Sequence, residues 1–218
     1  MEKSMYSLIL IDQVVKKIDE LAEAKGISRS GLVNQILAEH VSFLTPQQQI
    51  EDAFAAIGRE VGGIDGLRAK QSSAGMMYIK SVLNYRYNPA IRYSVELGLE
   101  SDQFVGELKV SSRTQSDTLR ARLSIFYEVW SQVEATALRG AMPQFTIAGD
   151  RFARKLKIKG GEGPLSAEAA GKVIGQYLLL LDKALKMSFE GSHGMDVQIY
   201  QQILALYGEY IDAGKISI

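Results

Sequence analysis

The sequence predicts an α+β protein in two parts: a short strand-helix-helix segment, followed by a larger, mainly helical α+β domain with β-hairpins. Three patterns predict this class. Apolar residues alternate with a period of two near the N-terminus, they recur every three or four residues over longer stretches, and alternation returns in the middle of the chain. The 218 residues are 46% hydrophobic and 23% charged, which is ordinary globular composition. A chain of this length is able to bury a substantial core.

The first part covers residues 1–45. Alternation over residues 5–11 predicts a strand, and Asp12 is expected to cap the helix that follows. Gly26 comes after the last turn of that helix, where a left-handed glycine commonly ends helices. Ser28 is expected to begin a second helix, whose apolar face continues almost to the end of this part.

The second part begins with a connection over residues 46–66, in which a helix starting at Pro46 ends in a glycine-rich hinge. The remaining residues, 67–218, form the larger α+β domain. It is expected to open with a helical stretch over 67–88. Alternation over 91–99 and again over 105–111 then predicts an antiparallel hairpin.

The C-terminal half continues with a predicted helix over 119–137, because its apolar residues follow the spacing of one helical stripe, although residues 118–125 also alternate as in a strand. Residues 145–158 predict a second hairpin that turns at Gly149. Two helices complete the chain. Ser166 is expected to cap the first, and Gly214 to close the second.

Composition excludes several classes of chemistry. The chain has no cysteine, which excludes disulfides, cysteine-ligated metals and thiol nucleophiles. Its two histidines, His40 and His193, have no evident partners for a catalytic triad or a metal site. No enzyme motif is present, so we expect no enzymatic activity, no cofactor and no metal.

The charge balance and the N-terminus bear on partners and location. Lys and Arg number 25, as do Asp and Glu, so any surface that binds nucleic acid has to be local. No apolar run approaches the 18 residues of a membrane span, and the first residues lack the basic region of a signal peptide. We therefore expect a cytoplasmic protein that does not contact membranes.

Residues 5–44 resemble the ribbon-helix-helix family of DNA-binding proteins. The resemblance is carried by four segments in order, namely the strand Tyr6–Leu10, the helix Asp12–Ala22, the turn Gly26–Ser30 and the helix Leu32–Leu37. It implies a homodimer or higher even oligomer, in which two strands pair as an antiparallel ribbon that enters the major groove of DNA.

The resemblance also assigns DNA contacts residue by residue. The ribbon positions expected to face the bases are Lys3, Met5, Ser7 and Ile9. The start of the second helix is expected to hold a DNA phosphate on the backbone N–H groups of Ser28, Arg29 and Ser30. The implied function is a dimeric, sequence-specific DNA-binding protein, most simply a transcriptional repressor.

Two features keep alternatives open. Met5 and Ile9 offer only apolar contacts to bases, and residues 1–45 hold five basic against six acidic side chains. The alternative to DNA binding is that residues 5–44 serve only for dimerisation, in a structural or interaction protein. Within DNA binding, the alternative is an accessory protein of plasmid partition or of a relaxosome.

Two further patterns lie in the larger domain, which we expect to bind a small-molecule or protein effector, add DNA contacts or assemble dimers. Residues 151–159 contain five basic side chains and no acid, and an extended strip would align Arg151, Lys155, Lys157 and Lys159 on one face. Such a strip either contacts phosphates or protects a strand edge from aggregation. Tyrosines and basic residues also interleave over 78–93, where they stack on bases, hold an aromatic ligand or pack between a helix and a strand.

Overall fold

The computed structural model describes residues 7–41, 44–138, 143–158, 165–190 and 195–212. Its contacts divide the chain into two compact units, which are described separately: an N-terminal unit, Met1–Gln49, and a C-terminal unit, Ile50–Ile218. In the part of the chain that is described, no helix is both long and apolar enough to cross a membrane.

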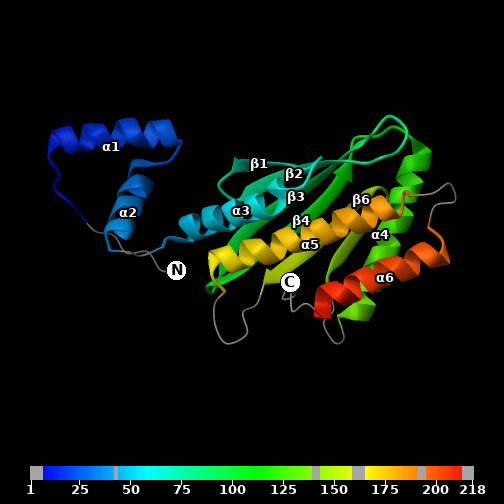
Figure 1. Cartoon of the computed structure of the whole chain (residues 1–218). Helices are drawn as coiled ribbons and strands as arrows, with labels where there is room; N and C mark the ends of the chain where they lie inside the picture. Colours follow the sequence, from blue (N-terminus) through cyan, green and yellow to red (C-terminus); the bar gives the residue numbers. More distant parts are fainter. Residues whose placement is uncertain (1–6, 42–43, 139–142, 159–164, 191–194, 213–218) are drawn as a thin grey trace. The chain divides into compact units, whose positions relative to one another are not determined.

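The N-terminal unit consists of two helices, α1 (Asp12–Lys25) and α2 (Arg29–His40), joined by a tight turn (Figure 1). As predicted, Gly26 ends α1 in the left-handed conformation, with φ of 66°, and its N–H donates to the backbone carbonyls of the preceding turn. The helices pack through a small core made of Ile18, Ala22 and Leu32.

The predicted strand at the start of this unit is not present in the residues described. Residues 7–11 approach α1 without a strand partner, and the first strand-forming residues of the prediction, 5 and 6, lie outside the described part. An isolated strand has nowhere to form its backbone ladder, so a single copy leaves this segment unpaired. Asp12 is also the first residue of α1 rather than its cap, a position that Ile11 occupies with extended backbone.

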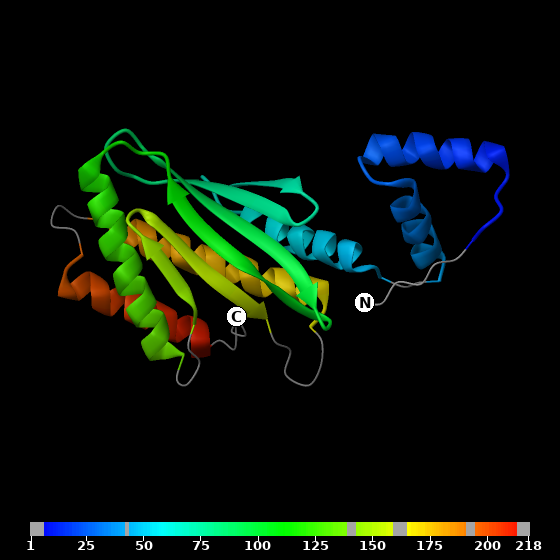
Figure 2. The same ribbon diagram turned by 180° about the vertical axis from the view of Figure 1, so that it is seen from behind.

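The C-terminal unit is built on one antiparallel sheet, with strand order β1-β2-β3-β4-β6-β5. The strands are β1 (Arg68–Ser73), β2 (Met76–Val82), β3 (Ala90–Glu100), β4 (Gln103–Ser112), β5 (Phe145–Ala148) and β6 (Arg151–Ile158). The helices are α3 (Pro46–Gly62), α4 (Asp117–Ala137), α5 (Ala167–Met187) and α6 (Val197–Asp212). These helices gather on one face of the sheet and leave the other face open (Figure 2).

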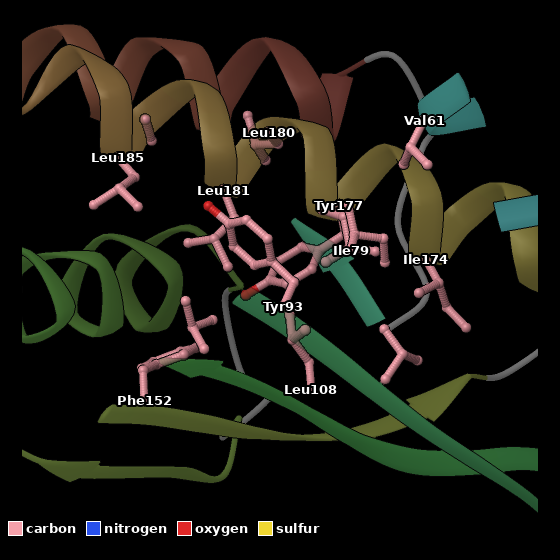
Figure 3. Packing of buried hydrophobic residues seen from close by; sticks show 14 of the residues in the cluster. Val61, Ile79, Tyr93, Leu108, Phe152, Ile174, Tyr177, Leu180, Leu181 and Leu185 are labelled. Carbon is pink, nitrogen blue, oxygen red and sulfur yellow. The ribbon is translucent and has the colours of Figure 1, made fainter. Parts of the chain in front are cut away.

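The core lies between that helical layer and the inward side chains of the sheet. In Figure 3, Ile174, Tyr177 and Leu181 of α5 lie opposite Tyr93 and other residues of the strands. Helix α5 also packs closely on α3: a Cβ atom added at Gly171 would lie 2.3 Å from the carbonyl oxygen of Ala53. From Ile50 onward, the helix predicted as a connector therefore contributes to the core of the C-terminal unit.

A buried polar cluster is enclosed in this core. Arg154 of β6 is 2% exposed, and its guanidinium is held by the carboxylate of Glu134 at 2.6 Å. Tyr177 donates to the other oxygen of Glu134 at 2.9 Å, and the Trp130 indole donates to Tyr177 at 3.1 Å. Although burial alone lowers the pKa of Arg154, Tyr177 and Glu134 raise it above its usual value. The cluster therefore keeps a compensated cation in an apolar interior.

Most elements of the C-terminal unit agree with the sequence analysis. Both predicted hairpins form, as β3–β4 and β5–β6, and Gly149 turns the second with φ of 59°. Helix α4 forms over the predicted stretch, and Ser166 caps α5 by accepting from the N–H of Ala169. Gly214 lies outside the described residues.

The helix predicted over residues 67–88 is wrong, because this stretch forms the hairpin β1–β2. The inward residues of β2, Met77 and Ile79, alternate over too short a run to stand out from a helical pattern. Strand β1 is exposed along its whole length and has no apolar periodicity of its own, so its conformation depends on pairing with β2.

Candidate nucleic-acid interface

Of the four predicted base-facing residues, Ser7 and Ile9 are described, and Lys3 and Met5 lie outside the described part. Both Ser7 and Ile9 are exposed to solvent in the segment that precedes α1. In a single copy nothing positions these side chains relative to a groove. The ribbon predicted from the sequence needs a second strand, which one chain does not supply.

The predicted phosphate site lies at the first turn of α2. Ser28 accepts a hydrogen bond from the N–H of Gly31 at 3.1 Å, so its side chain caps the helix. Ser30 is exposed beside it, with its hydroxyl 3.3 Å from that of Ser28. The guanidinium of Arg29 binds the carboxylate of Asp19 on α1, and this hydrogen bond lowers the pKa of Asp19. The side chain of Arg29 is thus already paired with an acid, whereas the prediction concerns the backbone N–H groups of this turn.

The N-terminal unit exposes an unusual amount of apolar surface. Beyond its small core, most of its large aliphatic side chains remain accessible: Leu8, Ile9, Leu10, Ile11, Val14, Leu21, Ile36, Leu37, Val41 and Leu44. Several of these were predicted to form the buried face of α2. Two helices are too few to cover them within one copy.

The predicted basic strip lies on β6, and its alternation is as expected. Arg151, Lys155 and Lys157 are exposed on the open sheet face, and Lys159 lies outside the described residues. Lys155 is not a free cation, since its ammonium group lies 3.0 Å from the carboxylate of Glu107. The hydrogen bond from Lys155 lowers the pKa of Glu107.

The open face carries a second basic group, in which strand register adds Arg68 to Lys80 and Arg92 of the predicted aromatic–basic cluster. Arg68 of β1 lies directly opposite Lys80 of β2, and Lys80 lies directly opposite Arg92 of β3. These residues are separated along the chain, so only the strand register brings them into one line. Arg68 by itself carries no signal in a sequence that has 25 Lys and Arg residues.

The tyrosines of the predicted aromatic–basic cluster separate into two sets. Tyr93 is buried and donates to Asp182 at 2.9 Å, and Tyr85 packs edge-on against Phe189. Tyr78 lies on the open face under the Arg92 guanidinium, and Tyr87 is fully exposed. The packing interpretation thus holds for the first pair, and the second pair remains accessible to a ligand.

Comparisons with known proteins assign no family. No protein-family model, curated protein or solved structure matches the chain.

The side chains of Glu134, Arg154 and Tyr177 form an ionisable cluster in the core, in which each is at most 2% exposed and is hydrogen-bonded within the cluster. Within the described residues, no group of three acidic or histidine side chains could hold a metal ion. A cavity of about 420 Å³ lies beside α3, lined by Phe54, Leu67 and Met77 together with Arg68 and Gln71.

Proposed function

We propose that the chain is a homodimeric, sequence-specific DNA-binding protein of the ribbon-helix-helix kind, most simply a transcriptional repressor. The observation that carries this proposal is the apolar surface of the N-terminal unit, which stays exposed in a single copy. This surface belongs to two helices that are joined by a turn at Gly26, as expected for the family. The helix lengths, the left-handed Gly26 turn and the capped start of α2 support the same assignment.

A second copy would cover this surface. Pairing of residues 5–11 in two chains gives each strand a partner and brings the four helices around one shared core. Burying a leucine or isoleucine side chain stabilises by about 1.5–3 kcal/mol, so burial of most of the exposed aliphatic residues would offset the entropy cost of association. Leu10 is one of these residues, on the face of the segment opposite Ser7 and Ile9.

The paired strands would present Met5, Ser7 and Ile9 to the major groove, and the N-termini of the two α2 helices would hold phosphates. Ser7 supplies the hydroxyl that reads base edges, and the two apolar residues contact thymine methyl groups. Since the Arg29 guanidinium is paired with Asp19, phosphate binding at this turn would rely on the backbone N–H groups rather than on the Arg29 side chain.

The experiment is a selection of duplexes from a random library by the purified full chain, followed by titration of the selected sequence against a scrambled one. Ser7→Ala is expected to reduce discrimination by about 1 kcal/mol, roughly fivefold, whereas Ser131→Ala on α4 serves as the matched control and leaves it unchanged. Met5→Arg should raise affinity for all duplexes, because it adds a cation to the ribbon.

If no sequence is enriched and Met5→Arg gains nothing, the ribbon does not enter the groove, and the N-terminal unit serves for dimerisation only. If the selected sequences occur as arrays beside partition or mobilisation genes, the accessory role replaces the repressor.

A further inference from the structure

A line of like charges crosses the open sheet face. Arg68, Lys80 and Arg92 occupy directly opposite positions on three adjacent strands, and directly opposite like charges destabilise a sheet. Within the part of the chain that the structure describes, none of the three takes part in an ion pair. Folding alone gives no reason for this arrangement.

The rest of the same face shows how the sheet compensates basic residues elsewhere. Lys109 of β4 lies 2.8 Å from Glu96 and 3.1 Å from Glu107, and Lys155 binds Glu107 as well. The hydrogen bonds that Lys109 donates, above all the one to Glu96, raise its pKa. Glu96 and Glu107 thus neutralise lysines of β4 and β6, whereas β1 and β2 contain no acidic residue. The uncompensated positive charge is therefore confined to one part of the sheet face.

Aromatic surface accompanies this charge. The guanidinium of Arg92 lies 4.4 Å from the centre of the Tyr78 ring, and its Nε is buried without a hydrogen-bond partner among the described residues. Lys70 of β1 lies directly opposite Tyr78, which places a further cation beside the ring. A guanidinium stacked on a ring presents a flat, charged surface on which another planar group can stack.

The connection between β2 and β3 adds a second aromatic group. Tyr87 is 101% exposed and has φ of 64°, a left-handed conformation that non-glycine residues adopt at a cost. Its neighbour Arg86 is also exposed. This connection joins the strand that carries Lys80 to the strand that carries Arg92, so the exposed ring lies at the same end of the sheet as those two cations.

We propose that this surface, the basic row formed by Arg68, Lys70, Tyr78, Lys80 and Arg92 together with Tyr87, binds single-stranded nucleic acid. Phosphates offset the mutual repulsion of the cations, and unpaired bases stack on Tyr87 and on the Arg92–Tyr78 pair. An open sheet face favours a single strand, because the bases of a duplex are stacked inside it and cannot reach the rings. The site is separate from the proposed ribbon and does not depend on it.

The first test measures binding of the full chain to a fluorescein-labelled oligodeoxythymidine of about 20 nucleotides by anisotropy, at several salt concentrations. The double variant Lys70→Glu/Lys80→Glu should bind at least tenfold more weakly. Its salt dependence should be shallower by about 1.4 in log–log slope, from ~0.7 per lost phosphate contact. The matched control, Lys172→Glu/Lys183→Glu, makes the same charge change at exposed positions of α5, outside the sheet, and should stay within about twofold of the unmodified chain.

The second test separates stacking from charge. Tyr87→Ala should weaken binding about tenfold, whereas Tyr87→Phe keeps the ring and should retain affinity within about twofold. Equal losses for the two lysine double variants would show only a general charge effect and would overturn the proposal. So would equal affinities for Tyr87→Ala and the unmodified chain, or failure of that chain to bind the oligonucleotide at low salt.

Failure of this inference is distinguishable from failure of the proposed function. Leu10→Asp, which disrupts the proposed dimer, should abolish selective duplex binding but leave each chain able to bind the oligonucleotide. If binding of the oligonucleotide is lost with Leu10→Asp and retained in Lys70→Glu/Lys80→Glu, the N-terminal unit holds the strand and the basic row does not.

Discussion

Removing one member of the buried Glu134–Arg154 pair should destabilise the C-terminal unit strongly. Arg154→Met leaves the Glu134 carboxylate, which is 0% exposed, without its cation. Breaking a buried pair in this way costs about 3–5 kcal/mol. For a unit of this size, each kcal/mol lowers the melting temperature by roughly 2–4 °C, so a decrease of about 10 °C is expected.

The double variant Glu134→Gln/Arg154→Met provides the internal control. Glutamine keeps a carbonyl that accepts from Tyr177, and no uncompensated charge remains in the core. We therefore expect the double variant to recover at least about 2 kcal/mol relative to Arg154→Met alone, although it carries one substitution more.

The assay is urea unfolding followed by far-UV circular dichroism and by fluorescence of Trp130, the single tryptophan. Trp130 is buried in the C-terminal unit and donates to Tyr177, so its signal reports on this core. A loss below about 1 kcal/mol in Arg154→Met, or a double variant no more stable than that single one, would refute the reasoning that charge compensation holds this cluster together.

Three further predictions concern assembly, pH and packing. Leu10→Asp should place a charge in the proposed dimer core and yield monomers in sedimentation. Val197→Asp, at an exposed position of α6, is the control and should leave the dimer intact. A dimeric Leu10→Asp chain would count against the proposed interface. Burial raises the pKa of Tyr93, Tyr127 and Tyr177 above 10.0 in the folded chain. Because these tyrosines ionise near pH 10 only in the unfolded chain, the free energy of unfolding should decrease as the pH rises above 10, by ~1.4 kcal/mol for each tyrosine at pH 11. Urea midpoints that do not decrease between pH 9 and pH 11 would contradict this. Gly171→Ala should lower the melting temperature by several degrees, because its Cβ would lie 2.3 Å from a carbonyl oxygen of α3; calorimetry showing no change would mean that the helices separate freely.

Regular amphipathic elements could be predicted from the sequence because their pattern is local. Helix α4 repeats its apolar residues over many turns, and the turn at Gly149 and the cap at Ser166 are encoded by single residues. Strand β1 could not be predicted in this way, since its six exposed residues acquire their conformation only from β2. The strand expected before α1 is absent from residues 7–11 for a related reason, because a single chain does not supply the partner strand that it needs.

The candidate surfaces likewise combine features that are local in the sequence with features that depend on strand pairing. The strip on β6 is contiguous in sequence, so its alternation was visible, but the carboxylate of Glu107 that neutralises Lys155 comes from another strand. The line from Arg68 to Arg92 arises only from strand register, which no local pattern specifies. The same alternation places Arg154 on the face opposite the strip, but its pairing with Glu134 in the core comes from another element and could not be predicted.

The most direct test of the proposed function is the stoichiometry of the complex with a selected duplex, measured by sedimentation with the duplex labelled. One chain has a mass of 24.0 kDa. Because the ribbon requires two strands, the account predicts that the complex contains two chains per duplex, or a multiple of two, and no species with one. A complex with a single folded chain per duplex, or a protein that stays monomeric at micromolar concentration and leaves every duplex free, would contradict it.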